Sequence, residues 1–110
     1  KSDGKQLRSY CHALDCASAM LTVLVAGESG NAYNISNPHS ICTISELAAE
    51  IAKAGNVKVV FEAPTDGEKR VFNMMDNSSL NSTKLEGLGW TPCFDLASGI
   101  NNMLEDFNEI

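Results

Sequence analysis

Residues 7–26 read LRSYCHALDCASAMLTVLVA and contain the longest apolar stretch of the chain. Its beginning predicts a short strand over residues 7–12, and the rest predicts a helix from about Leu14 to Ala26. The apolar residues that recur at helical spacing are Ala17, Met20, Leu21, Leu24 and Val25. Most of the remaining helix positions are also apolar. A helix of this kind is buried on more than one side, so we expect it to have more than one packing partner.

The rest of the chain adds two further long helices. Thr43 and Glu46 form a capping box that opens one helix, and Gly55 ends it. Asp95 caps the last helix. The apolar face of that helix comprises Leu96, Ile100, Met103, Leu104 and Phe107.

Short elements lie between these helices. Residues 32–35 and 57–61 are predicted strands, the second because Val57, Val59 and Phe61 alternate with Lys58 and Glu62. Residues 64–67 are predicted to be a loop, and residues 82–86 a short helix. The fold class is therefore α/β to α+β, with residues 1–110 forming one small lobe of helices and a few short strands.

Composition excludes several classes of protein. The net charge is −6 with only eight basic residues, which argues against nucleic-acid binding. The longest apolar stretch, residues 13–26, is too short to span a membrane. The four cysteines show no zinc-site spacing, and three lie in apolar runs typical of reduced thiols. We therefore expect a cytoplasmic protein without a metal site. The polar start without Met suggests a piece of a longer chain.

A second landmark, residues 81–92, reads NSTKLEGLGWTP. Three other landmarks precede it in the chain: Gly4 with Arg8-Ser9-Tyr10, then Asp15, then Tyr33-Asn34-Ile35. Together they resemble the carboxy-terminal lobe of the extended short-chain dehydrogenase/reductase family, the NAD-dependent nucleotide-sugar epimerases and dehydratases. The resemblance implies that this lobe binds a UDP- or dTDP-sugar. It also implies that a Rossmann domain outside this sequence binds NAD and carries the epimerase, dehydratase or decarboxylase chemistry.

Arg8 is the first candidate binding residue. Its guanidinium is planar, always charged and able to hold two phosphate oxygens. In the family that this chain resembles, the arginine that corresponds to Arg8 contacts the diphosphate of the nucleotide sugar. The alternative is an ordinary exposed arginine at a strand end. Ser9 stands where many members of the family have Asp.

Arg70 and Asn73 are the other candidates. Arg70 lies 18 positions before Leu88, the separation at which UDP-galactose 4-epimerases place a second diphosphate-binding arginine. Asn73 occupies the position of an acidic residue that holds the ribose, and its amide oxygen can accept from a hydroxyl. The alternative for Arg70 is a solvated charged loop. We expect Arg8 and Arg70 to converge on one anion site.

No catalytic residue is predicted in this chain. The family's catalytic Tyr is followed by Lys four residues later, whereas Tyr10 is followed by Leu14 and Tyr33 by Asn37. No glycine-rich turn links a strand to a helix, so we expect the piece alone to bind no NAD and to be inactive.

Three further expectations follow from the same residues. Trp90 should be a buried structural anchor. The apolar helix over residues 14–26 should leave a face that promotes self-association or meets the absent domain. The competing interpretation of the whole chain is a small non-enzymatic interaction or regulatory domain.

Overall fold

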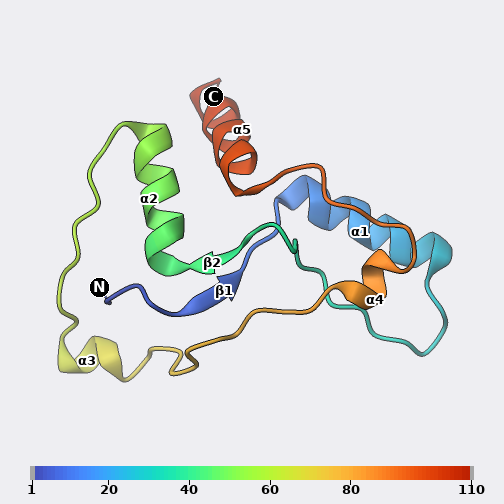
Figure 1. Cartoon of the computed structure of the whole chain (residues 1–110), viewed down its shortest axis with the longest axis horizontal. Helices are drawn as coiled ribbons and strands as arrows, with labels where there is room; N and C mark the ends of the chain where they lie inside the picture. Colours follow the sequence, from blue (N-terminus) through green and yellow to red (C-terminus); the bar gives the residue numbers. More distant parts are fainter. Residues whose placement is uncertain (1, 110) are drawn as a thin grey trace.

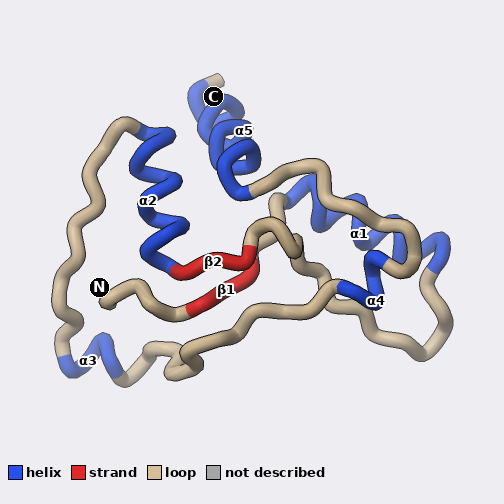
Figure 2. The backbone as a smooth tube through the Cα atoms, viewed as in Figure 1, coloured by secondary structure: helices blue, strands red, loops and turns tan. Residues whose placement is uncertain are grey.

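The computed structural model describes residues 2–109. The chain forms, in order, β1 (Leu7–Ser9), α1 (Ala13–Ala26), β2 (Ile41–Thr43), α2 (Ile44–Gly55), α3 (Asp66–Lys69), α4 (Thr83–Glu86) and α5 (Leu96–Asn108). In Figure 1, α2 and α5 stand beside each other on one side of the small sheet, and α1 and α4 form the opposite end of the molecule. Figure 2 shows how much of the backbone between these elements is loop. The α/β character predicted from the sequence is confirmed.

The sheet consists of β1 and β2, which pair antiparallel with Arg8 opposite Cys42. The pairing continues beyond the strands, because Ile44 N–H donates to the Gln6 carbonyl at 3.1 Å. The other edge of β1 receives residues from far along the chain. Leu7 N–H donates to the Asp76 carbonyl at 2.7 Å, and Ser78 N–H donates to the Leu7 carbonyl at 3.1 Å. Residues 76–78 are thus held against β1.

The helix α1 begins and ends close to the predicted positions. His12 caps it through Nδ1, which accepts from Leu14 N–H at 3.2 Å. Asp15 in its first turn is buried and accepts hydrogen bonds from two backbone N–H groups of the segment that leads into α5. These bonds tie the beginning of α1 to the beginning of α5.

The helices α2 and α5 pack against each other. The predicted capping box opens α2: Thr43 Oγ1 accepts from Glu46 N–H at 3.2 Å, and the Glu46 carboxylate accepts from Thr43 N–H at 2.7 Å. Asp95 caps α5 as predicted, with Oδ1 accepting from Ser98 N–H at 2.8 Å. The hydrogen bonds to Ser98 lower the pKa of the Asp95 carboxyl.

The buried core lies between α1 and α4. It comprises Ala19, Leu85 and Trp90, with Cys11, Val23, Tyr33, Ile35 and Leu88 packed against it. Trp90 is 3% exposed, and its indole N–H donates to Ser18 Oγ at 3.0 Å. The predicted structural role of Trp90 is confirmed, since burial with a satisfied N–H is typical of an anchoring tryptophan.

Three predicted short elements differ in the structure. Residues 32–35 and 57–61 form no strand, because no other segment within residues 2–109 pairs with them. The region predicted to be a loop over residues 64–67 contains the start of α3, which Thr65 and Glu68 open with a second capping box. The two wrong strand predictions share one cause: alternation signals a sheet surface, but a strand also requires a partner.

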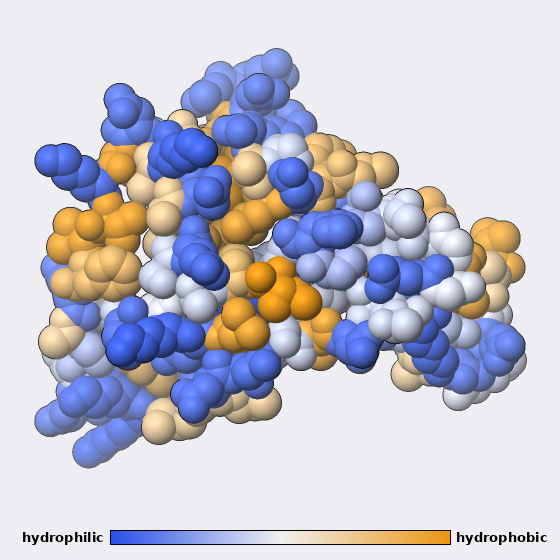
Figure 3. All heavy atoms as spheres, viewed as in Figure 1, coloured by the Kyte–Doolittle hydropathy of each residue, from blue (hydrophilic) through white to orange (hydrophobic). Residues whose placement is uncertain are grey.

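The molecule is more open than a compact domain of its length. Its radius of gyration is 16.2 Å, against about 13 Å for a compact domain of this size. In this open arrangement, one side of α1 is left without a packing partner within residues 2–109. We call this side the α1 apolar face, and it consists of Leu14, Met20, Leu21, Leu24 and Val25, each at least 56% exposed. Figure 3 shows apolar side chains exposed at the end of the molecule where α1 lies.

Candidate functional site

A cavity of about 330 Å³ lies beside the start of β1. Its lining comes from three separate parts of the chain: the segment around β1, the first residue of α2, and the loop after α3. The lining residues are Ser2, Gln6, Arg8, Ile44, Phe72 and Asn73. The cavity therefore combines a cation, two amide side chains, a hydroxyl and two apolar walls, and this is a suitable mixture for a polar ligand with an anionic group.

Arg8 occupies the middle of β1, and its backbone is fixed by the pairing with Cys42. Its Nη1 donates to the Leu7 carbonyl at 2.8 Å and to the Met75 carbonyl at 3.0 Å. Within residues 2–109, Arg8 has no carboxylate partner, and its Nε and Nη2 make no hydrogen bonds. One nitrogen of the guanidinium thus orients the group, while its other donors are available for a ligand. An uncompensated guanidinium on a cavity wall attracts phosphate or carboxylate.

Asn73 reaches the same cavity from a position 65 residues later in the chain. Its Oδ1 accepts from Met75 N–H at 3.0 Å, which shapes the loop locally. The loop is joined to β1 by the Arg8–Met75 hydrogen bond and by the contacts of residues 76–78. Two of the three candidate residues predicted from sequence, Arg8 and Asn73, therefore line one cavity.

The third candidate, Arg70, is exposed and follows the last residue of α3. It is not among the residues that line the cavity. Its convergence with Arg8 on one anion stays a prediction. Trp90 is also not among the residues that line the cavity, in agreement with its structural role.

Sequence reasoning missed Gln6 and Phe72 as cavity residues. A signal for Gln6 was present, because residues two apart in an extended segment lie on the same side and Arg8 was already a candidate. No comparable signal exists for Phe72, whose place depends on the path of the loop after α3.

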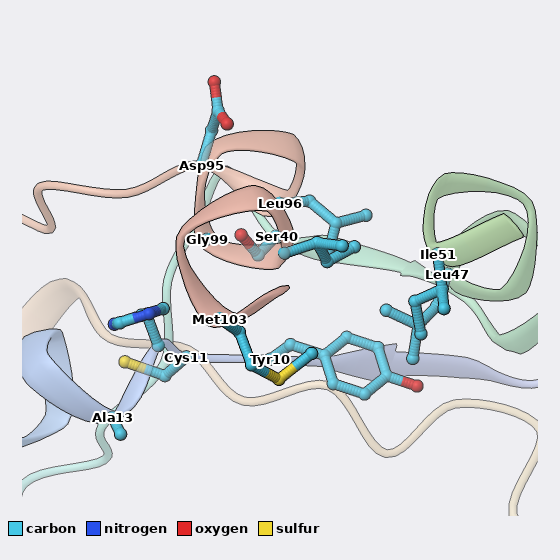
Figure 4. A pocket seen from close by; sticks show the side chains of 12 residues that line it. Tyr10, Cys11, Ala13, Ser40, Leu47, Ile51, Asp95, Leu96, Gly99 and Met103 are labelled. Carbon is cyan, nitrogen blue, oxygen red and sulfur yellow. The ribbon is translucent and has the colours of Figure 1, made fainter. Parts of the chain in front are cut away.

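A second cavity of about 340 Å³ lies among α2, α5 and the residues that lead into α1. Figure 4 shows Tyr10 and Met103 on one side and Leu47 and Ile51 of α2 on another, while the Asp95 carboxylate points away from the rest. Burial raises the pKa of the Tyr10 phenol and of the Cys11 thiol. Both groups stay protonated near neutral pH, so neither is activated as a base or nucleophile.

Two other kinds of feature are absent from residues 2–109. No cluster of three or more His, Cys, Asp or Glu side chains in this part of the chain could hold a metal ion. No helix in the same range has the length and apolar character needed to cross a membrane.

Comparison with known proteins agrees with the family predicted from sequence. Residues 1–36 match the model of the NAD dependent epimerase/dehydratase family. The chain is 29% identical to human dTDP-D-glucose 4,6-dehydratase over 116 residues, which cover 96% of this chain and 31% of that protein. It is 31% identical to UDP-glucuronic acid decarboxylase 4 of Arabidopsis thaliana, over 97% of this chain and 23% of that protein.

The solved structures give the same result for the fold. The crystal structure of dTDP-glucose 4,6-dehydratase from Bacillus anthracis in complex with NAD matches 98% of this chain with a TM-score of 0.81 and 23% identity. The match covers 33% of that structure. The chain is therefore similar to a part of the NAD-dependent epimerases and dehydratases, the enzymes of the extended short-chain dehydrogenase/reductase family. It spans about a third or less of the length of the relatives it matches.

Proposed function

We propose that this chain is the nucleotide-sugar-binding, carboxy-terminal part of an NAD-dependent enzyme that acts as a dehydratase, epimerase or decarboxylase on a UDP- or dTDP-sugar. The observation that carries the proposal is the cavity that Arg8, with unused donors, lines together with Asn73 from a distant loop. The similarity over almost the whole chain to nucleotide-sugar enzymes supports it. The same similarity favours an enzyme over an independent interaction or regulatory domain.

Each candidate residue has a defined role in this proposal. Arg8 binds the diphosphate through Nε and Nη2 while Nη1 keeps the guanidinium in place. Asn73 accepts or donates a hydrogen bond at a hydroxyl of the ribose. Arg70 adds a second charge to the diphosphate once the ligand is bound. These residues supply affinity and orientation, which is the proximity contribution to catalysis.

The catalytic groups and the NAD site belong, in this proposal, to the part of the parent protein outside this sequence. The α1 apolar face is the surface that meets that part, since an apolar face of this extent marks a contact site. Residues 32–35 follow α1 in the chain and lack a strand partner within residues 2–109. A strand of the absent part would satisfy their backbone groups. The four free thiols agree with a reducing, cytoplasmic location.

The test is substrate binding by the full-length parent protein. Arg8→Ala should weaken binding of UDP- or dTDP-glucose by about ten- to a hundredfold, the value of one charge-assisted hydrogen-bonding group. The matched control is Lys58→Ala, which removes one positive charge from an exposed residue away from the cavity lining. If Arg8→Ala and Lys58→Ala both change the affinity only slightly and to the same extent, the proposed site is contradicted.

Because Arg8 also holds the Met75 carbonyl, loss of binding could come from a displaced loop. Arg8→Lys separates the two effects, since Lys keeps the charge but cannot hold the loop and two phosphate oxygens at once. The site predicts a large loss of affinity for Arg8→Lys with an unchanged melting temperature. A melting temperature that falls in parallel with affinity would assign Arg8 a structural role.

A further inference from the structure

Gln6 lines the Arg8 cavity, and its side chain carries an unexplained buried polar atom. Its side-chain oxygen Oε1 is buried and has no hydrogen-bond partner. Such atoms are rare in folded proteins, because a buried acceptor without a donor loses the hydrogen bonds it made to water. Within residues 2–109, two other side-chain oxygens share this state, Ser36 Oγ and Asn102 Oδ1. Of these three residues, Gln6 alone lines one of the two cavities described above.

The backbone holds Gln6 in a fixed relation to Arg8. The Gln6 carbonyl accepts from Ile44 N–H at 3.1 Å, which extends the ladder of β1 and β2 by one step. In extended backbone, residues two apart point to the same side and lie roughly 7 Å from each other. Gln6 and Arg8 therefore face the same cavity from adjacent positions. A ligand phosphate on Arg8 would bring the neighbouring atoms of the ligand to Gln6.

We propose that Gln6 is a binding residue of this site and that Oε1 accepts a hydrogen bond from a hydroxyl group of the ligand next to the phosphate on Arg8. The inference rests on the proposed function and adds a selectivity to it. Arg8 recognises the anion, and Gln6 recognises the hydroxyl-bearing ring attached to it. The ring is either the ribose or the transferred sugar, which share this chemistry. The unpaired acceptor gains its donor only in the complex.

The test compares Gln6→Met with Arg8→Ala in the full-length parent protein by calorimetric titration. Methionine keeps the length of the side chain and removes the acceptor. Four probes separate the possible donors: UDP, 2′-deoxy-UDP, glucose 1-phosphate and inorganic pyrophosphate, which has no hydroxyl. Gln6→Met should weaken the hydroxyl-bearing ligand that it contacts by about three- to tenfold, the value of one neutral hydrogen bond. Binding of pyrophosphate should be unchanged.

The pattern over the probes identifies the ring. Loss with UDP but not with glucose 1-phosphate assigns the ribose, and a smaller loss with 2′-deoxy-UDP assigns its 2′-hydroxyl. Loss with glucose 1-phosphate assigns the sugar. Equal binding of all four probes by Gln6→Met and the unchanged protein would overturn the inference while leaving Arg8 intact. If Arg8→Ala binds pyrophosphate and UDP as well as the unchanged protein does, the proposed function fails and this inference with it.

Stability provides an independent readout. Removing an unpaired buried acceptor should leave the melting temperature of the ligand-free protein unchanged or raise it. A lower melting temperature for Gln6→Met would show that Oε1 already serves the fold, and would overturn the proposal. Weaker hydroxyl-dependent binding together with undiminished stability is the outcome that a purely structural role cannot produce.

Discussion

Asp15 is the residue on which the relative placement of α1 and α5 depends, and replacing it should destabilise the protein strongly. Its side chain is 1% exposed. Oδ1 accepts from Cys93 N–H at 2.8 Å, and Oδ2 accepts from Phe94 N–H at 3.0 Å. Both donors belong to the segment that positions Asp95 at the beginning of α5. One carboxylate therefore fixes the connection between two parts of the fold that are 78 residues apart.

The magnitude follows from these two bonds. A hydrogen bond to a charged group contributes about 1.5–3 kcal/mol, and Asp15→Ala removes two of them while leaving both N–H groups without that acceptor. Because Cys93 is exposed, water recovers part of the loss, so we expect the lower end of the sum, about 3 kcal/mol. Asp15→Asn keeps one acceptor oxygen and should cost about half as much.

Urea unfolding followed by the fluorescence of Trp90, the single tryptophan, measures this difference. The control is Asp106→Ala, which removes the same charge from an exposed position of α5 and should change stability by less than about 0.5 kcal/mol. A loss below about 1 kcal/mol for Asp15→Ala, or equal losses for the Ala and Asn variants, would refute the reasoning. If Asp15→Ala does not fold, the Asn variant still gives the intermediate value to be compared.

Three further predictions concern the core, the exposed face and pH. Ser18→Ala should lower the free energy of unfolding by about 1–3 kcal/mol, because the buried indole N–H of Trp90 loses its acceptor. Urea titration measures this loss, and an unchanged free energy of unfolding would contradict a stabilising role for the Trp90–Ser18 hydrogen bond. Replacing Leu21 and Val25 by Ser should abolish concentration-dependent self-association of the 110-residue chain in light scattering; a chain that is monomeric before the substitution would rule out the α1 apolar face as an adhesive surface. Because folding lowers the pKa of Asp95, the carboxylate stabilises the fold fully above its unfolded pKa, and this stabilisation disappears as the pH falls through its folded pKa. Asp95→Asn should therefore reduce the fall in melting temperature at acid pH. A melting temperature that falls with pH equally in both proteins would contradict the role of Asp95 as a cap.

Local chemistry accounts for the parts of the fold that the sequence predicted. The capping box of Thr43 with Glu46 and the cap at Asp95 involve contacts three residues apart, so their geometry is already specified by the chain. The same rule would have found α3 from Thr65 and Glu68, but Pro64 and Gly67 favoured a loop. The three-residue strand β2 is too short to show an alternating pattern.

Non-local pairing accounts for the parts that it did not predict. The pattern of Val57, Val59 and Phe61 with Lys58 and Glu62 predicted a strand, but whether a strand forms depends on a partner that the pattern does not contain. The cavity is a similar case. Arg8 and Asn73 were predicted separately, yet they share a wall only because residues 75–78 hydrogen-bond to β1. The assembly of such a cavity depends on long-range contacts, and the spacing of residues in the sequence does not encode them.

The negative charge of the chain explains why the affinity of the proposed site for an anion should depend on few residues. With a net charge of −6, the 110-residue chain repels an anionic ligand at long range, so the affinity of this part must come from donors in direct contact. Arg8 meets this requirement because Nη1 is held by two carbonyl oxygens and the group needs little reorganisation on binding. Salt screens the long-range repulsion over about 10 Å at 0.1 M but weakens the direct pair less. The ligand should therefore associate faster as moderate salt is added, whereas a binding site built on a diffuse positive patch would lose association rate under the same conditions.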